Sequence, residues 1–271
     1  MSELPERNDE EAVMSRATRN VIDLKHETFD KFYEYWLVEQ DRCLQQLLAA
    51  ARTGDGEEDR LRHLVNEVLR HYENYYANKS RSAKKDVLAV LSPSWTSTLE
   101  EAFLWIGGWR PTVAVHLLYS KASLQLEDQL EGFLRGISTG DLGDLSPEQL
   151  GQVDGLHRRT VREENKITEK MAKLQETVAD STMVRLSQAA TEVKGEGGEV
   201  EEEVERALEK KKEGMEKVVG MADDLRMRTL KGVVEFLGPL QAVHYLIAAA
   251  ELHLRFHEWG KKMDAAGKSD H

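Results

Sequence analysis

The fold class of this chain is decided by the stretch SPEQLGQVDGLHRRTVREENKITEKMAKLQE, residues 146–176. Ser146 is a candidate N-cap, and Pro147 occupies the first helical position, where a proline is tolerated. Gln149 stands three residues after the cap and can complete a capping box. No glycine or proline follows Gly155 within this stretch. These features predict a long helix that begins at residue 147.

The helical pattern continues beyond this stretch in both directions. Apolar residues recur at spacings of three and four over residues 29–91, 200–236 and 242–263. The segment that begins at residue 147 runs to about residue 192 with no proline or glycine after Gly155, and we expect it to break near residues 180–181. Only five prolines occur in 271 residues, and no alternating strand pattern is found. The chain is therefore predicted to be all-α, a single domain of about eight helices that includes long antiparallel ones.

Composition sets the expected boundaries of this domain. Residues 1–25 are polar and acidic, and we expect them to be disordered. Residues 26–262 carry the helical pattern and form the predicted domain, and residues 263–271 are expected to be a flexible tail. Because 40% of the residues are hydrophobic, the chain has enough apolar material for a sizeable core.

One apolar stretch, LWIGGWRP at residues 104–111, stands apart from the long helices. We expect a short apolar helix over residues 97–109 that ends at Gly107 and Gly108, because glycine is the usual residue at a helix C-terminus. Pro111 then starts the next helix. The two glycines are expected to permit a positive φ or a close approach of the backbone.

The other residues of this stretch are also expected to be structural. Arg110 is predicted to pair with a carboxylate or to cap a helix end. The predicted structural motif comprises Trp105, Gly107, Gly108, Arg110 and Pro111. Tryptophans are expected to supply much of the core, namely Trp36, Trp95, Trp105 and Trp109.

Charge and cysteine content exclude several classes of protein. The net charge is −12, whereas a protein that binds nucleic acid by its own surface presents a dense basic patch, so we expect no direct nucleic-acid binding. The single cysteine, Cys43, excludes an internal disulfide framework and a cysteine-based zinc site. The N-terminus lacks the apolar region of a secretory signal, and no run of about 18 apolar residues could span a membrane.

The sequence contains no recognisable catalytic motif. The stretch GEGG at residues 195–198 does not follow a strand and lacks the form of a phosphate-binding loop. The stretch HEW at 257–259 is not the metalloprotease motif, because Lys261 stands where the second histidine would be. We therefore expect that the chain is not an enzyme.

Two histidines are the exception among these polar residues. His253 and His257 lie four residues apart in AELHLRFHEWG, residues 250–260, and would share one face of a helix. They could hold one metal ion together. They could not supply both axial ligands of one haem, because those approach the iron from opposite sides. The alternative is that both are partly exposed and hydrogen-bond to nearby acidic residues.

Several blocks of this chain, in order, resemble one plant protein family. They include WLVEQ (36–40), the segment LRHLV to KDV (61–87), LEEAFLWIGGWRP (99–111), the helix quoted first, and ADDLRMRTLKGVVEFLGPLQA (222–242). The chain is similar to the delay-of-germination, or seed dormancy control, domain. That domain is shared with the C-terminal half of TGA-type bZIP transcription factors. Residues 1–25 contain no basic region or zipper, so the resemblance favours the dormancy branch.

The resemblance implies a non-enzymatic regulatory protein that acts by protein contact in seed dormancy, abscisic-acid or developmental signalling. It implies that His253 and His257 are candidates for binding haem. It implies type 2C protein phosphatases as partners of the first helix, through a motif that FDKFYEYW (29–36) matches loosely. The corresponding partner-binding candidates are Phe29, Phe32, Tyr33 and Trp36.

Other members of the family leave alternatives open. The chain could instead be a transcriptional co-regulator that associates with TGA-type factors, or a membrane-associated factor of the pollen-aperture kind. TGA-like domains can also hold a fatty acyl chain in an apolar cavity. The expected location is the nucleus and cytoplasm, or the plasma-membrane periphery under the pollen-aperture hypothesis. Homodimer formation stays open.

Overall fold

The computed structural model describes residues 29–53, 58–128, 140–192 and 198–267. This part of the chain is helical and contains no strand, which confirms the all-α prediction. In chain order its elements are α2 (Phe29–Thr53), α3 (Glu58–Lys85), α4 (Val87–Leu91), α5 (Thr98–Ala102), α6 (Thr112–Asp128), the 3-10 turn η1 (Leu142–Asp144), α8 (Pro147–Glu176), η2 (Thr177–Ala179), α9 (Ser181–Glu192), α10 (Gly198–Phe236) and α11 (Pro239–Gly267).

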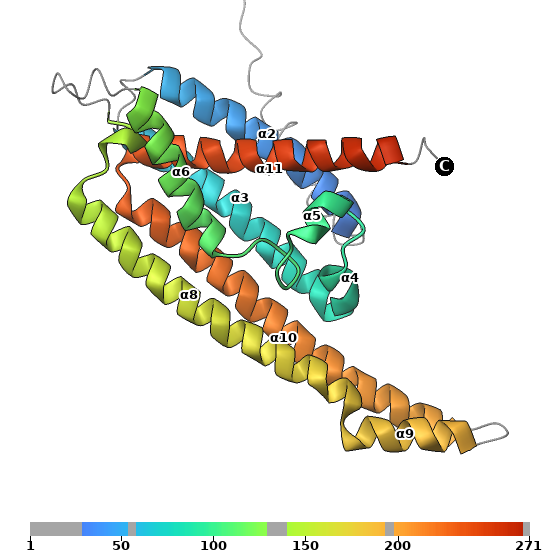
Figure 1. Ribbon diagram of the computed structural model, residues 1–271. Coiled ribbons are helices and arrows are strands. Elements are labelled where there is room, and N and C mark those ends of the chain that lie inside the picture. The colour runs from blue at the N-terminus through green and yellow to red at the C-terminus, as the bar shows by residue number, and fades with distance from the viewer. Residues whose placement is uncertain (1–28, 54–57, 129–139, 193–197, 268–271) are drawn as a thin grey trace, which may run out of the picture.

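Long antiparallel helices define the architecture, as the sequence predicts. Helices α8 and α10 run side by side along the lower edge of the molecule in Figure 1, and α9 packs against the first part of α10 at the far end. Helix α3 lies between α10 and the pair formed by α2 and α11. The short helices α4 and α5 fill the space below the C-terminal half of α11.

The predicted start and break of the long segment are both confirmed. The Ser146 side chain accepts a hydrogen bond from the backbone N–H of Gln149, and the Gln149 side chain accepts one from the backbone N–H of Ser146. The break lies at Asp180, whose carboxylate accepts hydrogen bonds from the backbone N–H of Met183 and from Lys211 Nζ. Asp180 thus caps α9 while its ion pair with Lys211 ties the break to α10.

In the described part of the chain the core consists of three apolar clusters, which are linked by residues that pack on two of them, such as Tyr72 and Ile106. The largest lies between α2, α3, α6 and α11 and is centred on fully buried residues such as Leu47, Leu118 and Leu246. A second, aromatic cluster joins α2 to α3, α4 and α10. A third joins Trp105 to α8 and α10. Three of the four predicted core tryptophans are buried, namely Trp36, Trp95 and Trp105, whereas Trp109 is half-buried.

Two predicted elements differ from the structure. The helix expected over residues 97–109 is only the five residues of α5, because the chain from Phe103 onwards forms a loop whose carbonyls are bound elsewhere. Helix α11 extends to Gly267, inside the predicted flexible tail 263–271. The predicted disordered segment 1–25 lies outside the described residues. None of the described helices is long and apolar enough to cross a membrane.

The glycine pair has the two properties that the sequence predicts. Gly107 has a φ of +68°, and a Cβ there would lie 2.8 Å from the carbonyl oxygen of Val90. Gly108 passes so close to α10 that a Cβ would lie 2.9 Å from Cζ of Arg226. Both positions therefore require glycine. Gly107 needs it for its positive φ and for the close approach of the Val90 carbonyl, and Gly108 for the close approach of Arg226.

Replacing Gly107 by alanine should lower the free energy of unfolding by about 2 kcal/mol or more, because a positive φ and a backbone clash are both imposed. Gly151 is the matched control, since it is exposed in α8 and nothing lies within 4 Å of its missing Cβ. Gly151→Ala should stabilise the chain by up to about 1 kcal/mol. Urea denaturation of both variants measures the difference. Equal effects of the two substitutions would contradict this explanation of the Gly107 position.

Candidate functional site

A buried arginine holds the loop that follows α5. Arg226 of α10 is 5% exposed and donates from Nε to the carbonyl oxygen of Trp109, at 2.6 Å. Its Nη2 donates to the carbonyl oxygens of Trp105 and Ile106, the latter at 3.1 Å. The guanidinium also lies over the Trp105 ring, 5.3 Å from the centroid. One side chain thus satisfies three carbonyls of the LWIGGWRP stretch.

The charge of this arginine is balanced inside the protein. Asp223 Oδ1 accepts hydrogen bonds from Arg226 Nη1 at 2.5 Å and from Lys79 Nζ at 2.8 Å. Lys79 is 1% exposed, and burial lowers the pKa of its ammonium to about 8. The second oxygen of Asp223 is buried and has no hydrogen-bond partner in the described part of the chain. The cluster joins α3 to α10 and carries two cations against one carboxylate.

The neighbouring residues confirm the predicted role of Arg110. Its Nη1 lies 3.5 Å from Oε2 of Glu164, a carboxylate that is 3% exposed. Glu164 Oε1 accepts the backbone N–H of Thr112 at 2.7 Å and so caps the start of α6. Trp105 donates its indole N–H to Thr168 at 3.0 Å. Arg110 and Trp105 thus join the Arg226 loop to α8.

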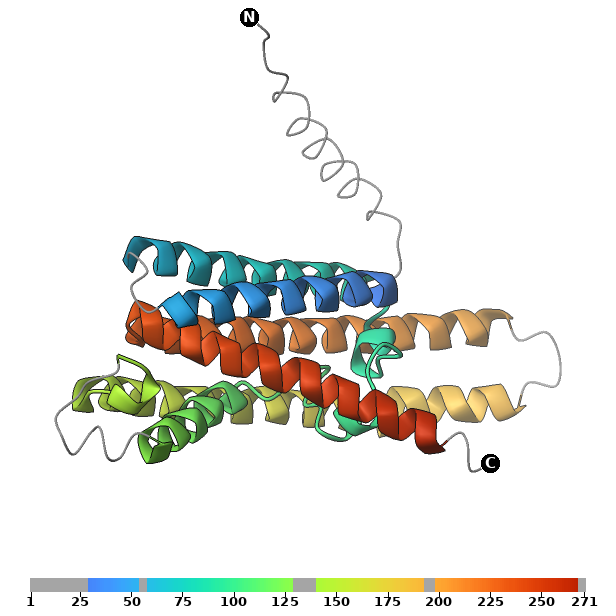
Figure 2. The same cartoon turned by 90° about the horizontal axis from the view of Figure 1, so that it is seen from above.

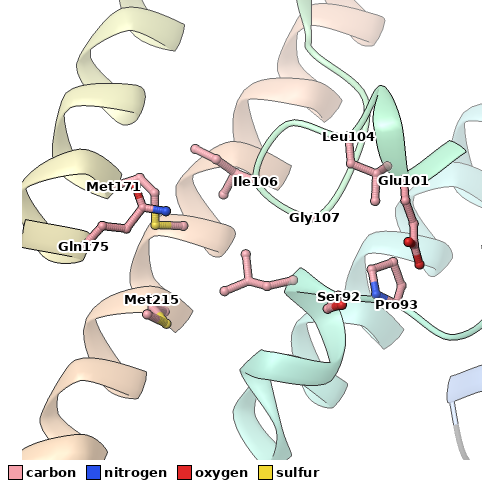
Figure 3. A pocket seen from close by; sticks show the side chains of 10 residues that line it. Ser92, Pro93, Glu101, Leu104, Ile106, Gly107, Met171, Gln175 and Met215 are labelled. Atoms are coloured by element: carbon pink, nitrogen blue, oxygen red, sulfur yellow. The ribbon is translucent and has the colours of Figure 1, made fainter. Parts of the chain in front are cut away.

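A depression of about 410 Å³ lies outside this loop (Figure 3). Ile106, Met171 and Met215 border it, and Glu101 and Gln175 stand at its edge. Ile106 has a φ of +48°, which is unusual for a β-branched residue. Its carbonyl and that of Trp105 both bind Arg226, so the strain has a structural cause. No motif in the sequence predicts this depression.

The histidine pair lies where α11 packs against α2 and α5, and the first of the two is held by aromatic rings. Tyr33 O–H donates to Nε2 of His253 at 3.2 Å, and the His253 ring lies 5.2 Å from that of Trp36. Burial lowers the pKa of His253 to about 4, so the ring is neutral at neutral pH and can accept this bond. A third histidine, His71, stacks on the Trp36 ring with the two ring centroids 4.7 Å apart. Burial lowers the pKa of His71 to about 4 as well.

The second histidine makes a different contact. His257 Nδ1 donates to Oε2 of Glu100 at 2.9 Å, and the Glu100 carboxylate is 2% exposed. The same oxygen accepts from the backbone N–H and the hydroxyl of Ser97, at 2.7 and 2.6 Å. Burial opposes ionisation of Glu100, but the bonds from His257 and Ser97 outweigh it and hold the pKa of this carboxyl below its usual range. Glu100 is thus ionised and ties α11 to α5.

These contacts decide how well the pair fits haem. His253 has its Nε2 bonded to Tyr33 and its ring inside an aromatic cluster, so iron would displace core packing. His257 donates through Nδ1 to a carboxylate, which is the usual arrangement of a metal-binding histidine and leaves Nε2 for a ligand. Its side chain is 16% exposed. Haem binding stays a prediction, and the donor geometry fits His257 alone.

Ligand space near the pair is small. The cavity beside His253 has a volume of about 140 Å³ and is lined by Tyr72, Trp109, Leu230 and Leu252, among others. Pockets for drug-sized ligands measure about 300–1,000 Å³. The cavity as folded is therefore too small to enclose haem or a long acyl chain. No group of three or more histidine, cysteine or acidic side chains in the described part of the chain could hold a metal ion.

The partner-binding candidates on α2 are placed inward. Tyr33 and Trp36 are each 3% exposed, and Phe29 and Phe32 are half-buried in the same aromatic cluster. The rings of Phe29, Tyr33 and Trp36 pack against Tyr75, and Phe32 packs on Phe29, so these side chains face the core of the domain. This corrects their assignment as contact residues, because helical spacing alone does not distinguish a core face from a binding face.

A partner could reach a different set of α2 residues, which are exposed. Tyr35 is 60% exposed and Val38 is 72% exposed, so both face away from the core. The sequence signal was present, since Tyr35 falls out of phase with the apolar spacing of Phe32, Tyr33 and Trp36. An aromatic residue out of phase with the core stripe is the feature to seek.

Acidification should destabilise the protein through its buried histidines. For His71 and His253 the folded-state pKa of about 4 lies below the unfolded value of 6.5. Between these values the unfolded chain binds more protons, so stability falls as the pH falls from 6.5 towards 4. Each histidine should contribute a loss of about 1–3 kcal/mol.

Urea unfolding at pH 7 and pH 5 measures this loss. The substitution His253→Gln keeps a group that can accept from Tyr33 but does not titrate, so it should reduce the pH dependence. His116→Gln is the control, because His116 is exposed. An unchanged pH dependence in His253→Gln would show that this histidine is not held neutral by the fold.

Comparison with known proteins places the chain in a family. The family model for seed dormancy control matches residues 43–120. Protein DOG1-like 3 of Arabidopsis thaliana is 34% identical over 238 residues, which is 85% of this chain and 82% of that protein. Protein DOG1-like 1 of the same plant is 34% identical over 252 residues, or 86% of this chain and 88% of that protein.

A more distant similarity extends to transcription factors. The TGACG-sequence-specific DNA-binding protein TGA-1A of Nicotiana tabacum is 29% identical over 239 residues, which is 87% of this chain but 58% of that protein. The predicted resemblance to both branches is thus confirmed. At this identity and coverage, and with this all-helical fold, the chain belongs to the seed dormancy control (DOG1) family of plant regulatory proteins.

Proposed function

We propose that this protein is a non-enzymatic regulator in seed dormancy or developmental signalling linked to abscisic acid, and that it acts by binding another protein. The observation that carries the proposal is the outer face of α2, where Tyr35 and Val38 are exposed. Family membership supports the regulatory role, and relatives that are regulatory proteins give indirect support to the absence of enzymatic activity.

The outer face of α2 is suited to recognition because its helix is fixed from behind. Trp36 and Tyr33 anchor α2 in the aromatic cluster, so Tyr35 and Val38 are presented on a rigid backbone. Exposed tyrosines on rigid elements are frequent hot spots of interfaces, because they bury a large area at a low cost in side-chain entropy. Lys31 and Glu34 are exposed on the same helix and would form a polar rim.

Two partner classes follow from the family. A type 2C protein phosphatase is the first, because the resemblance links such enzymes to the helix that carries Tyr35. A TGA-type bZIP factor is the second, and the similarity to TGA-1A favours it as an alternative. In both cases the protein would contact DNA only through its partner, in keeping with its net charge of −12.

Pull-down of purified phosphatase and of purified TGA-type factor by the full chain tests the proposal. The double variant Tyr35→Ala/Val38→Ala should lose at least about tenfold in affinity for the partner, with little change in thermal stability, since both side chains are exposed. Val184→Ala is the matched control, because Val184 is 49% exposed on α9. Binding of neither class, or binding that the double variant leaves unchanged, would refute the proposal.

A second proposal concerns haem as a regulatory ligand, and the bond between His257 and Glu100 favours it. When bound, haem would supply a redox- or gas-responsive iron; His257 would hold it through Nε2 while Glu100 keeps the ring oriented. The Glu100 carboxylate would accept the Nδ1–H of His257 and leave Nε2 facing the iron. His253 would take no part, since it accepts a bond from Tyr33.

Titration of the chain with haem, followed in the Soret region, distinguishes these roles. The substitution His257→Ala should abolish a saturable Soret shift, whereas His253→Gln should leave it unchanged. A circular dichroism spectrum of each variant confirms that the helices remain. The assignment would be refuted if the parent chain shows no Soret shift. It would also be refuted if His253→Gln abolishes the shift while His257→Ala retains it.

A further inference from the structure

Helix α8 carries a straight row of cations on its outward side. The row consists of residues at successive steps of three, four, four and three, namely Arg159, Arg162, Lys166, Lys170 and Lys173. At 3.6 residues per turn these positions fall within a wedge of about 80° around the helix axis and span about 21 Å of its length. All of these side chains are exposed. We call this surface the α8 basic row.

The inward face of α8 fixes the position of the row. Ile167 and Met171 are buried on that face, in one cluster with Trp105 and residues of α10. The capping box at Ser146 fixes the start of the helix. Helix α8 follows the lower edge of the molecule in Figure 1, so the row lies on a rigid backbone at the edge of the fold. A surface that is rigid before binding loses little entropy when a partner binds to it.

The positive charge of the row is not neutralised by the described part of the chain. No member of the row forms an ion pair with a described carboxylate, and Lys170 Nζ instead lies 3.7 Å from the sulfur of Met221. Two acidic residues of the same stretch have other partners, since Glu163 binds Arg228 at 2.7 Å and Glu164 lies 3.5 Å from Arg110. Glu169 is the remaining acidic residue between the ends of the row. The row therefore keeps a surplus of positive charge.

We propose that the α8 basic row binds an acidic helical segment of a partner protein. Neighbouring cations of the row are separated along the helix axis by rises of about 4.5 and 6 Å. A second helix with carboxylates three and four residues apart presents its charges at the same rises, as the charged positions beside a helix–helix seam do. Two such helices lying side by side can therefore oppose a carboxylate to each cation of the row.

The size of the row disfavours nucleic acid as the anion. Proteins that bind nucleic acid present a broad basic patch, whereas this row is one side chain wide. A duplex would extend beyond the row over the rest of a chain whose net charge is −12 with the row included. Charge repulsion acts there over a Debye length of about 8 Å at physiological ionic strength. A short acidic segment that ends where the row ends avoids this repulsion.

The composition of the row disfavours a membrane surface. A helix that lies on a membrane inserts an apolar face besides its charges. Between Arg159 and Lys173 no large apolar side chain is exposed, so the row has nothing to insert. Recognition therefore rests on charge and spacing, which an acidic helix supplies. The inference does not depend on the proposed function, because the outer face of α2 takes no part in it.

Titration of a labelled acidic peptide with the full chain, followed by fluorescence anisotropy, tests the inference. The peptide is an alanine-based helix that carries glutamates at the steps of the row, three, four, four and three. It should bind saturably at physiological salt, and Arg162→Glu/Lys170→Glu should raise the Kd by at least about tenfold. Lys84→Glu/Lys85→Glu is the matched control, because it changes the net charge equally at exposed positions of α3 and should leave the Kd within about twofold. Absent binding, or equal weakening by both variants, would overturn the proposal.

A charge exchange tests the register. The steps of the row read the same in both directions, so the second and fourth glutamates of the peptide oppose Arg162 and Lys170 whichever way the peptide runs. A peptide with lysine at these two places should bind Arg162→Glu/Lys170→Glu at least about tenfold more tightly than it binds the parent chain. Circular dichroism confirms that the variant keeps its helices. Absence of this preference would overturn the proposal.

Two other anions test the class of partner. A duplex oligonucleotide and vesicles that contain an anionic lipid are titrated under the same conditions as the acidic peptide. Both should bind more weakly than the peptide, and Arg162→Glu/Lys170→Glu should affect them less. Tighter binding of either one, weakened by the same substitutions, would assign the row to that class and overturn the proposal of an acidic protein segment.

Discussion

The buried guanidinium of Arg226 is the contact on which the rest of this structure depends. It binds the carbonyls of Trp105, Ile106 and Trp109, and through them it fixes the path of the chain between α5 and α6. Bringing such a charge into the interior is costly unless it is paired and hydrogen-bonded, and here Asp223 and three carbonyls meet that requirement. The loop is not helical: its carbonyls turn towards this arginine, and the backbone bonds between Trp105 and Gly108 close a tight turn in place of helical ones.

The fixed loop explains the surrounding positions in turn. Gly108 has no side chain because Arg226 passes 2.9 Å from where its Cβ would be, and Ile106 accepts a positive φ because its carbonyl must turn towards the same guanidinium. The arrangement positions α5, whose Glu100 receives His257 of α11. The histidine contact therefore depends on a motif that lies far from it in sequence.

The sequence predicted those features that depend on local chemistry. The capping box at Ser146 and the break at Asp180 follow from short-range rules, and the structure confirms both. The close approach at Gly107 and Gly108 was also predicted, but its causes, Val90 and Arg226, are contacts across the fold, and the helix that the pair was expected to end stops already at Ala102. The Arg226 cluster could not be predicted in this way, since Lys79 and Asp223 are separated by 143 intervening residues and read as ordinary surface charges on their helices. The early end of α5 follows from that cluster and was missed for the same reason.

For the candidate sites, too, the sequence predicted the helices but not the contacts between them. Periodicity identified α2 as aromatic and α11 as a carrier of paired histidines, but it could not say which face of each helix meets the core. On α2 the regular stripe is the core face, and the exposed residues are the ones out of phase, Tyr35 and Val38.

Helix α11 packs on α2, α3, α5, α6 and η1, and polar and apolar rows lie next to each other in its C-terminal half. The inward row includes polar side chains because Tyr33 and Glu100 supply their hydrogen-bond partners. A neighbouring row is apolar: Phe256 packs on Phe103 and Trp109, whereas Trp259 is 53% and Met263 60% exposed (Figure 2). Core packing therefore accounts for the histidines, whereas Trp259 and Met263 make little contact with the rest of their own chain. Their exposure is a cost to the isolated protein that burial against another surface would remove.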